Sequence, residues 1–441
     1  LARYNLVDQS VDAFEDASGI DASASTNEFR NDAGNYYSGA DVATDVAANF
    51  TASGTWTTPS NLSGTAKILV VAGGGTGGSS GWTPGGGGAG GLVYVSNYAA
   101  AASTSYGVTV GAGGAAITFD NSNQVAGNEG EDSVFDTAGV HQTLTASGGG
   151  GGGAYTPQAT DGGSGGGGAN SPTSQTGHGS AGATDQVVSF GSYTNVGFGF
   201  AGGTGYTAGF GACGGGGGAG SVGEANTSNS RSGNGGSGKD YSSIFGTGVG
   251  DDGWFSGGGG GSGFHSSSGS RGYGNGGNGN KGGGGDGAIY NTNGTSTAGA
   301  ANTGGGGGSD RSDQNTKAGG SGAVHILYDT LSYDDMTLVS NAQTAQAVPT
   351  KGDIVMTYSN GAGTATLNTD IKAYISRDSG TTYTQATLAS QGTTGGHEIV
   401  TAHDLDISSQ PSGSAMRFKI TTHNQSASKD TRVHGISLGW S

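Results

Sequence analysis

Long runs of glycine constrain this chain more than any other feature of its sequence. Between residues 73 and 322 the sequence returns repeatedly to pure glycine, in runs at residues 148–153, 165–168, 214–218, 257–261, 282–285 and 304–308. Most of the 99 glycines in the 441 residues lie in this region. Glycine-rich stretches are usually flexible linkers, so any order in these runs has to be argued from the residues that flank them.

Apolar segments enter and leave the glycine runs, which argues against a linker. Residues 66–72 read Ala-Lys-Ile-Leu-Val-Val-Ala and lead directly into glycine. Residues 91–98 and 106–110 are rich in β-branched and aromatic residues, and residues 319–328 close the region with another such segment. These segments are typical of buried strands. We therefore expect a folded domain in which strands continue into glycine.

The conformation expected for the runs is polyglycine II, the glycine form of the polyproline-II helix. That helix has three residues per turn and no internal hydrogen bonds, so rods without side chains can bond laterally to one another. Ordering each glycine costs about 1–2 kcal/mol of backbone entropy, while each lateral bond contributes about 0.5–1.5 kcal/mol. The lattice must therefore be nearly complete. A collagen triple helix is excluded because the sequence has no Gly-X-Y period.

The remaining sequence predicts two further parts. Residues 329–441 show about eight short alternating segments separated by turns such as Asn360-Gly and Pro411-Ser-Gly, which predicts an antiparallel β-sandwich. Residues 1–48 are acidic with isolated apolar residues, which predicts an extended attachment segment without a core of its own. The predicted domains are thus 1–48, 49–328 and 329–441, all-β with polyglycine-II rods and almost no helix.

Composition excludes several classes of function. The chain has 33 acidic against 16 basic residues and a net charge of −17, which argues against nucleic-acid binding through a basic patch. No apolar run is long enough to insert into a bilayer. The acidic residues Asp8, Asp12, Glu15 and Asp16 offer oxygen ligands for calcium, but their spacing fits a solvated face better.

Motifs for catalysis and cofactors are weak. Residues 233–239 resemble a phosphate-binding loop, but Asp240 stands where Ser or Thr is needed. No His or Cys spacing is typical of a metal site, and the single Cys213 reads as a small residue in a tight lattice. We therefore predict no catalytic residues, no metal and no cofactor, and the chain is not expected to be an enzyme.

An ordered succession of motifs spans residues 49–328. It comprises Trp56-Thr-Thr-Pro, Lys67-Ile-Leu-Val-Val-Ala-Gly-Gly-Gly, Gly85-Gly-Gly-Gly-Ala-Gly-Gly-Leu-Val-Tyr, Tyr106-Gly-Val-Thr-Val-Gly-Ala-Gly-Gly and Gly319-Gly-Ser-Gly-Ala-Val-His-Ile-Leu-Tyr. This succession resembles the glycine-rich domain of bacteriophage tail fibre and adhesin proteins. The resemblance implies a polyglycine-II sandwich whose variable loops contact a bacterial receptor. The chain departs from the related T-even phage adhesins because a further domain follows the glycine.

The segments between the glycine runs concentrate aromatic residues. Tyr and Trp supply large contact areas at low entropic cost in binding loops, and their rings also suit sugars. We predict that receptor contacts come from Tyr155, Tyr193, Phe198, Phe200, Tyr206, Phe210, Trp254, Phe255, Phe264 and Tyr273. The alternative for each ring is that it caps the glycine lattice or packs against other rings.

Two functions follow as expectations. The first is a phage tail fibre or receptor-binding adhesin that recognises a host surface glycan or an outer-membrane protein non-covalently. The second is a structural virion or extracellular fibre subunit without a receptor. A polysaccharide depolymerase is disfavoured because no paired acidic motif is present. Expected partners also include other virion or fibre subunits, with homo-oligomers among them, and the expected location is the virion or the extracellular surface.

Overall fold

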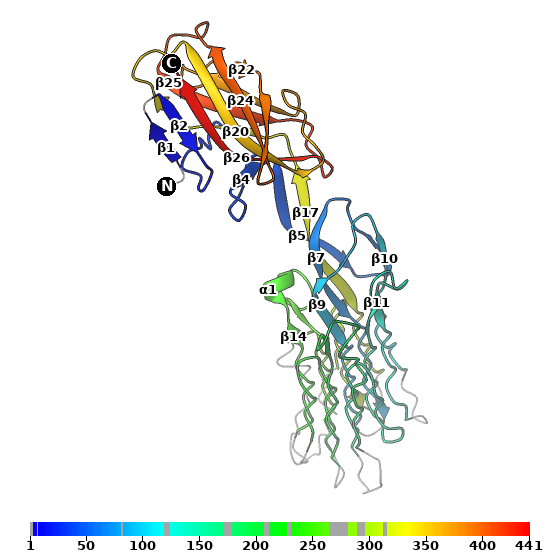
Figure 1. Ribbon diagram of the computed structural model, residues 1–441. Coiled ribbons are helices and arrows are strands. Elements are labelled where there is room, and N and C mark those ends of the chain that lie inside the picture. The colour runs from blue at the N-terminus through cyan, green and yellow to red at the C-terminus, as the bar shows by residue number, and fades with distance from the viewer. Residues whose placement is uncertain are drawn as a thin grey trace. The chain divides into compact units, whose positions relative to one another are not determined.

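The fold is nearly all β-structure, as the sequence predicts. The computed structural model describes residues 3–6, 8–80, 83–118, 124–170, 179–206, 211–226, 231–263, 281–288, 296–311 and 315–441 (Figure 1). Strands make up 39% and helix 1% of the structure. Within the described residues the helix is the single turn α1 (Ser242–Phe245), and no helix there is long and apolar enough to cross a membrane.

The chain divides into two compact units. One comprises residues 1–44 and 330–441, and the other comprises residues 45–329. The chain leaves the first unit within strand β5 (Ala40–Phe50) and returns within β17 (Ala323–Tyr333). We call the first the sandwich unit and the second the glycine unit.

The sandwich unit contains two antiparallel sheets around one apolar core. The first sheet has the order β1 (Arg3–Leu6), β2 (Gln9–Asp12), β26 (Asp430–Trp440), β20 (Lys351–Ala362), β24 (His397–Asp406) and β23 (Ala389–Thr394), and β4 (Tyr36–Ser38) joins β3 (Phe29–Asn31) to β26. The second has the order β18 (Thr337–Val339), β25 (Ala415–Thr422), β21 (Ile371–Ser376) and β22 (Thr384–Ala386), and β19 (Gln343–Thr344) also pairs with β25. Alternation along β25, where Met416, Phe418 and Ile420 are buried, explains why one face of this sheet lines the core.

The N-terminal residues complete this sandwich, which corrects the predicted attachment segment at 1–48. Strand β2 pairs with β26 in antiparallel register, Gln9 opposite Gly439. Phe14 and Tyr37 are buried in the same core as the C-terminal strands and meet edge to face at 5.1 Å. The isolated apolar residues of this segment therefore belong to a core whose other members all come after residue 335, about 300 residues or more away, which local periodicity could not reveal.

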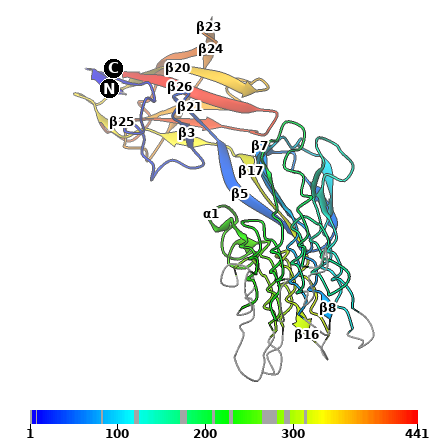
Figure 2. The ribbon, with the colours of Figure 1, turned by 90° about the horizontal axis from the view of Figure 1, so that it is seen from below.

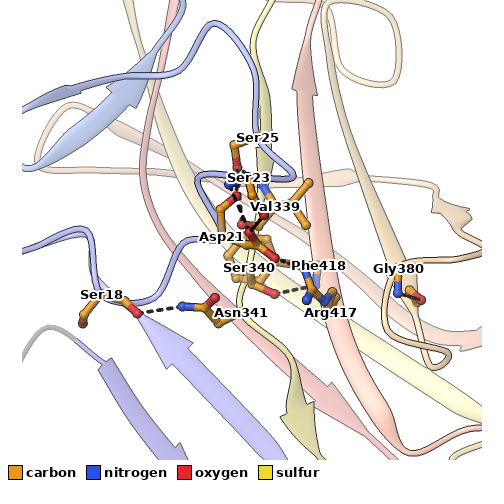
Figure 3. A network of polar contacts seen from close by, with 11 residues as sticks. Ser18, Asp21, Ser23, Ser25, Val339, Ser340, Asn341, Gly380, Arg417 and Phe418 are labelled. Atoms are coloured by element: carbon orange, nitrogen blue, oxygen red, sulfur yellow. Dashed lines mark hydrogen bonds and ion pairs between the residues drawn. The ribbon is translucent and has the colours of Figure 1, made fainter.

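The loop between β2 and β3 is bound to the second sheet by polar contacts (Figure 3). The backbone N–H of Asp21 donates to the carbonyl of Val339 at 2.9 Å, and Asn341 Nδ2 donates to the carbonyl of Ser18 at 2.9 Å. The Asp21 carboxylate pairs with Arg417 at 2.6 Å. The N-terminal segment thus bonds to both sheets of the sandwich.

The glycine unit begins as two packed antiparallel sheets. One has the order β13 (Gly197–Phe198), β9 (Leu92–Tyr98), β7 (Leu62–Val71), β17 and β5; the other has the order β12 (Leu144–Ala146), β11 (Ser133–Phe135), β10 (Ser105–Thr109) and β6 (Gly54–Thr57). Alternate residues of β7 enter two cores, because Ile68 and Val70 face one cluster while Leu69 and Val71 face the other. Two small pairs complete the unit, β14 (Lys239–Asp240) with β15 (Trp254–Phe255) and β16 (Asp310–Arg311) with β8 (Ser79–Ser80).

Glycine segments continue directly from these strands. After β7 the chain runs on as residues 72–78, residues 85–91 lead into β9, and residues 147–153 follow β12. Both views show extended segments without regular strand pairing running alongside one another from the sheets (Figures 1 and 2). Nearly all of their glycines are buried. The runs are therefore a packed interior, as the flanking strands predict, and not a linker.

Hydrogen bonds in this interior repeat every three residues. In the central segment 85–91, residues 85, 88 and 91 donate to segment 147–153, residues 86 and 89 donate to 214–217, and residues 87 and 90 donate to 304–307. Its carbonyl groups accept from three further segments, 72–78, 164–167 and residue 259. The N–H···O distances are ordinary, from 2.7 Å for Gly88 to 3.2 Å for Gly86. Six neighbours thus surround one segment.

This pattern differs from that of a sheet. A strand inside a sheet has two bonded neighbours and a two-residue period, whereas segment 85–91 has six neighbours and a three-residue period. Segment 214–219 repeats the pattern, since residues 214 and 217 donate to 168 and 165 and residues 216 and 219 donate to 259 and 256. A helix with three residues per turn would produce this period. The polyglycine-II conformation itself stays a prediction.

Cys213 lies inside this lattice. Its side chain has no exposed surface, and Sγ contacts the carbonyl oxygen of Ser262 at 2.7 Å. Burial raises the pKa of the Cys213 thiol to about 12, which keeps it protonated at neutral pH. The prediction that Cys213 is a small packed residue is confirmed.

Candidate functional site

The structure separates the ten predicted aromatic contacts into three groups. Phe210, Phe264 and Tyr273 lie outside the described residues. Two of the others are core residues, and five are partly or fully exposed. Only rings with exposed surface can meet a receptor.

Phe255 and Tyr193 are buried, which corrects their assignment as receptor contacts. Phe255 has 0% exposed surface and belongs to the cluster of Leu69 and Val71. Tyr193 is 8% exposed and stacks on Tyr98 with ring centroids 5.9 Å apart. Phe255 lies in β15 and Tyr193 lies shortly before β13, and for both rings packing against other core residues is the correct alternative.

The exposed rings lie at different places. Phe200 is 38% exposed on a glycine-rich segment. Tyr155 is half-buried in a bend, and Tyr206 is half-buried in a segment without regular structure, where its carbonyl accepts a bond from Asn170 Nδ2 at 2.7 Å. Trp254 is half-buried in β15. These four do not line a described cavity together.

Phe198 lies in a groove, and this groove is the candidate site. One wall is β9 and the other is residues 192–198, including β13. The walls are joined by pairing of Phe198 with Leu92 and by the Tyr94 N–H, which donates to the Val196 carbonyl at 2.9 Å. The groove has a volume of about 510 Å³.

Two partly exposed rings, Tyr94 and Phe198, and the edge of the buried Tyr193 line the groove, and each is held by its neighbours. The Tyr94 ring lies 4.9 Å from that of Tyr241. Lys239 Nζ lies 3.8 Å from the centre of the Phe198 ring, a cation–π contact. The hydroxyl of Tyr193 accepts a bond from the Ala99 N–H at 3.2 Å and lies 3.1 Å from His141 Nε2. The rings are therefore fixed without a ligand.

Small polar side chains line the rest of the groove. They are Ser96, Asn97, Ser192, Thr194 and Asn195, and all are exposed. None of these side chains hydrogen-bonds to another described residue, whereas the buried Tyr193 hydroxyl does. Their hydroxyl and amide groups can donate and accept, so the groove offers free hydrogen-bonding groups beside aromatic surface.

The lining of the groove is uncharged. It contains no Asp, Glu, Lys, Arg or His among the described residues. Burial raises the pKa of Tyr94, so its hydroxyl stays a neutral donor. Within the described residues no group of three or more His, Cys, Asp or Glu side chains is arranged to hold a metal. This geometry suits binding of a neutral polar ligand.

Sequence reasoning missed most of the groove. The sequence places Tyr94 and Asn97 in a predicted strand and does not mark them as binding residues. The signal was available in part, because strict alternation along β9 places Val93 and Val95 in one core and so turns Tyr94 to the other face. Its pairing with residues 192–198 lies about 100 residues along the chain and had no local signal.

A second, smaller groove lies in the sandwich unit. It has a volume of about 300 Å³ and is lined by Asp8, Gln9, Asp353, Val355, Ser437, Gly439 and Trp440. Asp353 already accepts a bond from the Asp404 N–H at 2.9 Å and lies 3.4 Å from His403 Nδ1. The Asp353 carboxylate is thus already engaged, and this groove contains none of the predicted aromatic contacts.

Comparison with known proteins bears on the glycine unit. A family model described as a glycine-rich domain matches residues 48–329, which is more than half of the chain. No curated protein and no solved structure matches the chain.

Proposed function

The chain belongs to the glycine-rich domain family, and on this premise we propose that it is a receptor-binding adhesin of the bacteriophage tail fibre type. Its task is non-covalent recognition of a glycan or an outer-membrane protein on the host surface. It acts from the virion or the extracellular surface and needs no cofactor.

One observation carries this proposal: the glycine segments of the glycine unit pack together through backbone groups. Six neighbours bond to segment 85–91 through N–H and C=O groups alone. The bonding between these segments needs no side chains, so residues between them that do not join the apolar clusters, as Tyr193 and Phe255 do, are free to vary. A scaffold of this kind can change its surface residues without losing stability, which suits a protein that must follow a variable receptor.

Binding to intact bacterial cells tests the proposal. Fluorescently labelled chain is incubated with a panel of bacterial strains, and bound label is measured by flow cytometry. We expect labelling of a subset of strains and competition by unlabelled chain. A variant with Phe198, Phe200 and Trp254 replaced by Ser should label those strains more weakly. Absence of strain-selective labelling across the panel would contradict receptor binding.

The structural fibre subunit remains the second candidate because of strand β23. All six of its residues are exposed, and it forms an edge of its sheet. Edge strands expose unpaired backbone groups that can pair with another chain. Assembly into large particles in light scattering, together with no cell labelling, would favour this function over the first.

A further inference from the structure

We propose that the groove between β9 and residues 192–198 binds an uncharged saccharide. This deepens the proposed receptor-binding function and rests on it. The ligand class is a neutral oligosaccharide or the neutral part of a longer glycan, and it is recognised by Tyr94 and Phe198 together with the side chains of Asn97, Thr194 and Asn195.

Two aromatic rings give the groove a surface against which a sugar ring can stack. A pyranose ring has one face made of C–H groups, and the negative face of an aromatic ring attracts such weakly positive hydrogens. Tyr94 and Phe198 are both partly buried and both line the groove. Each ring is held in place from behind or from one face, by Tyr241 at 4.9 Å and by Lys239 at 3.8 Å. Little side-chain freedom is then lost on binding.

The polar side chains of the groove can form hydrogen bonds with the sugar hydroxyls. Sugars carry hydroxyl groups around the ring edge, and each can donate and accept hydrogen bonds. The amides of Asn97 and Asn195 and the hydroxyl of Thr194 are exposed and make no bond to other described residues. Side-chain amides and hydroxyls can likewise donate and accept hydrogen bonds. They can therefore bond to sugar hydroxyls, and no charged group is needed.

Charge and size favour a neutral glycan over other ligands. No charged side chain lines the groove, and Lys239 beside it is engaged with the Phe198 ring. A cationic ligand would lose water without gaining a partner, and an anionic one would have to draw Lys239 away from its cation–π contact. The volume of about 510 Å³ is within the range of small-molecule sites, about 300–1,000 Å³. The groove is also continuous with solvent along exposed residues, so a longer glycan can extend beyond it.

A glycan array with matched variants tests this site. The full chain is applied to an array of neutral oligosaccharides of glucose, galactose, mannose and N-acetylglucosamine, with polygalacturonate fragments as the anionic comparison. The affinity of each hit is then measured by isothermal titration. The test variants are the double change Asn97→Ala with Asn195→Gly and the single change Tyr94→Leu. Glycine at 195 preserves the positive φ of 56° found there.

We expect at least one neutral hit and an affinity loss of about tenfold or more in the double variant, the sum of two lost hydrogen bonds. Tyr94→Leu should also weaken binding, while Tyr94→Phe should retain most of it. If Tyr94→Leu does not fold, the double variant at exposed positions still decides. The control is Thr55→Ala, an exposed hydroxyl in β6 of the other sheet, and it should bind as the parent chain does.

The outcomes separate this inference from the proposed function. No neutral hit, or neutral hits that the double variant binds unchanged, overturns the saccharide site. If the same double variant still labels bacterial cells as the parent does, receptor binding stands and the groove is not its site. Conversely, groove-dependent glycan binding without labelling of any strain keeps the saccharide site and contradicts the adhesin function.

Discussion

The carbonyl oxygen of Gly75 lies where a side chain on residue 87 would begin: a β-carbon built on Gly87 would be 2.2 Å from that oxygen. This distance is far below van der Waals contact, and the obstacle is backbone held by hydrogen bonds on several sides. The closeness of the segments therefore depends on glycine at this position, just as their bonding depends on close approach.

Replacing Gly87 by Ala should destabilise the glycine unit. Either segment 85–91 or residues 72–78 must move, and overpacking of a closely packed interior costs about 1–3 kcal/mol. Because bonds to neighbouring segments would lengthen together, we expect a value at the upper end. Calorimetric unfolding of the variant measures the change.

The matched control is Gly248→Ala. Gly248 is exposed, and a β-carbon there meets nothing within 4 Å. Substitution of this kind usually stabilises by about 0.4–1 kcal/mol through the unfolded state. Equal effects of the two substitutions would contradict the close-packed lattice.

Amide hydrogen exchange should be slow throughout segment 147–153. Its amides at 149, 150, 152 and 153 bond to the carbonyls of residues 73, 164, 76 and 167, so exchange requires opening of several segments at once. Mass spectrometry of peptides covering this segment measures it. The exposed glycines Gly395 and Gly396, in the turn between β23 and β24, should exchange within seconds. Equally fast exchange in segment 147–153 would show that this glycine run behaves as a flexible linker.

The class of fold could be predicted from the sequence alone, because the patterns that indicate strands and glycine segments are local in the chain. The alternation in β25 and the apolar segment of β7 are read within ten residues, and the glycine runs are visible directly. The three-residue period was expected from polyproline-II geometry. What the sequence could not reveal is which segment bonds to which, because glycine has no side chain to mark a partner.

The candidate site was harder to predict because burial of each aromatic ring depends on residues far away in the sequence. Phe255 and Phe198 look alike in sequence, each an aromatic residue in the second position of a two-residue strand. One is fully buried and the other lines a groove. The difference depends on long-range neighbours such as Val71 and Leu92, and likewise Phe14 joins a core formed mainly by residues after 330.

Replacing Asp21 by Asn should weaken the sandwich unit at neutral pH but hardly at pH 2. The Ser23 hydroxyl, followed by Arg417, lowers the pKa of Asp21 to about 2 (Figure 3). The stability it contributes is thus present above its ordinary pKa of 3.8 and is lost as pH falls toward 2. Chemical unfolding of parent and variant across this range measures the difference. Ser23→Ala should give a smaller effect of the same sign, and a difference that persists at pH 2 would contradict this role.

The glycine unit should lose stability between pH 6.5 and 4 through His325. This side chain is 2% exposed, and its Nδ1 lies 2.8 Å from Asn49 Oδ1, the acceptor for the proton on that nitrogen. Nε2 is buried without a hydrogen-bond partner in the described structure. A second proton would therefore place an unpaired charge inside the unit, and burial lowers the pKa of His325 to about 4.

The direction of the pH effect follows from which state binds the proton first. The unfolded chain protonates His325 near its ordinary pKa of 6.5, whereas the folded chain resists until about 4, so stability is intact above pH 6.5 and falls as pH drops through this window. One pKa unit corresponds to about 1.4 kcal/mol, so the loss reaches at most about 3 kcal/mol. Calorimetric unfolding at pH 7 and pH 4.5 measures it. His325→Phe keeps a ring beside Phe255 and should reduce the pH dependence, while His403→Gln, at a side chain 63% exposed, should leave it unchanged. A His325→Phe variant with the parent's full pH dependence would assign the effect to other groups.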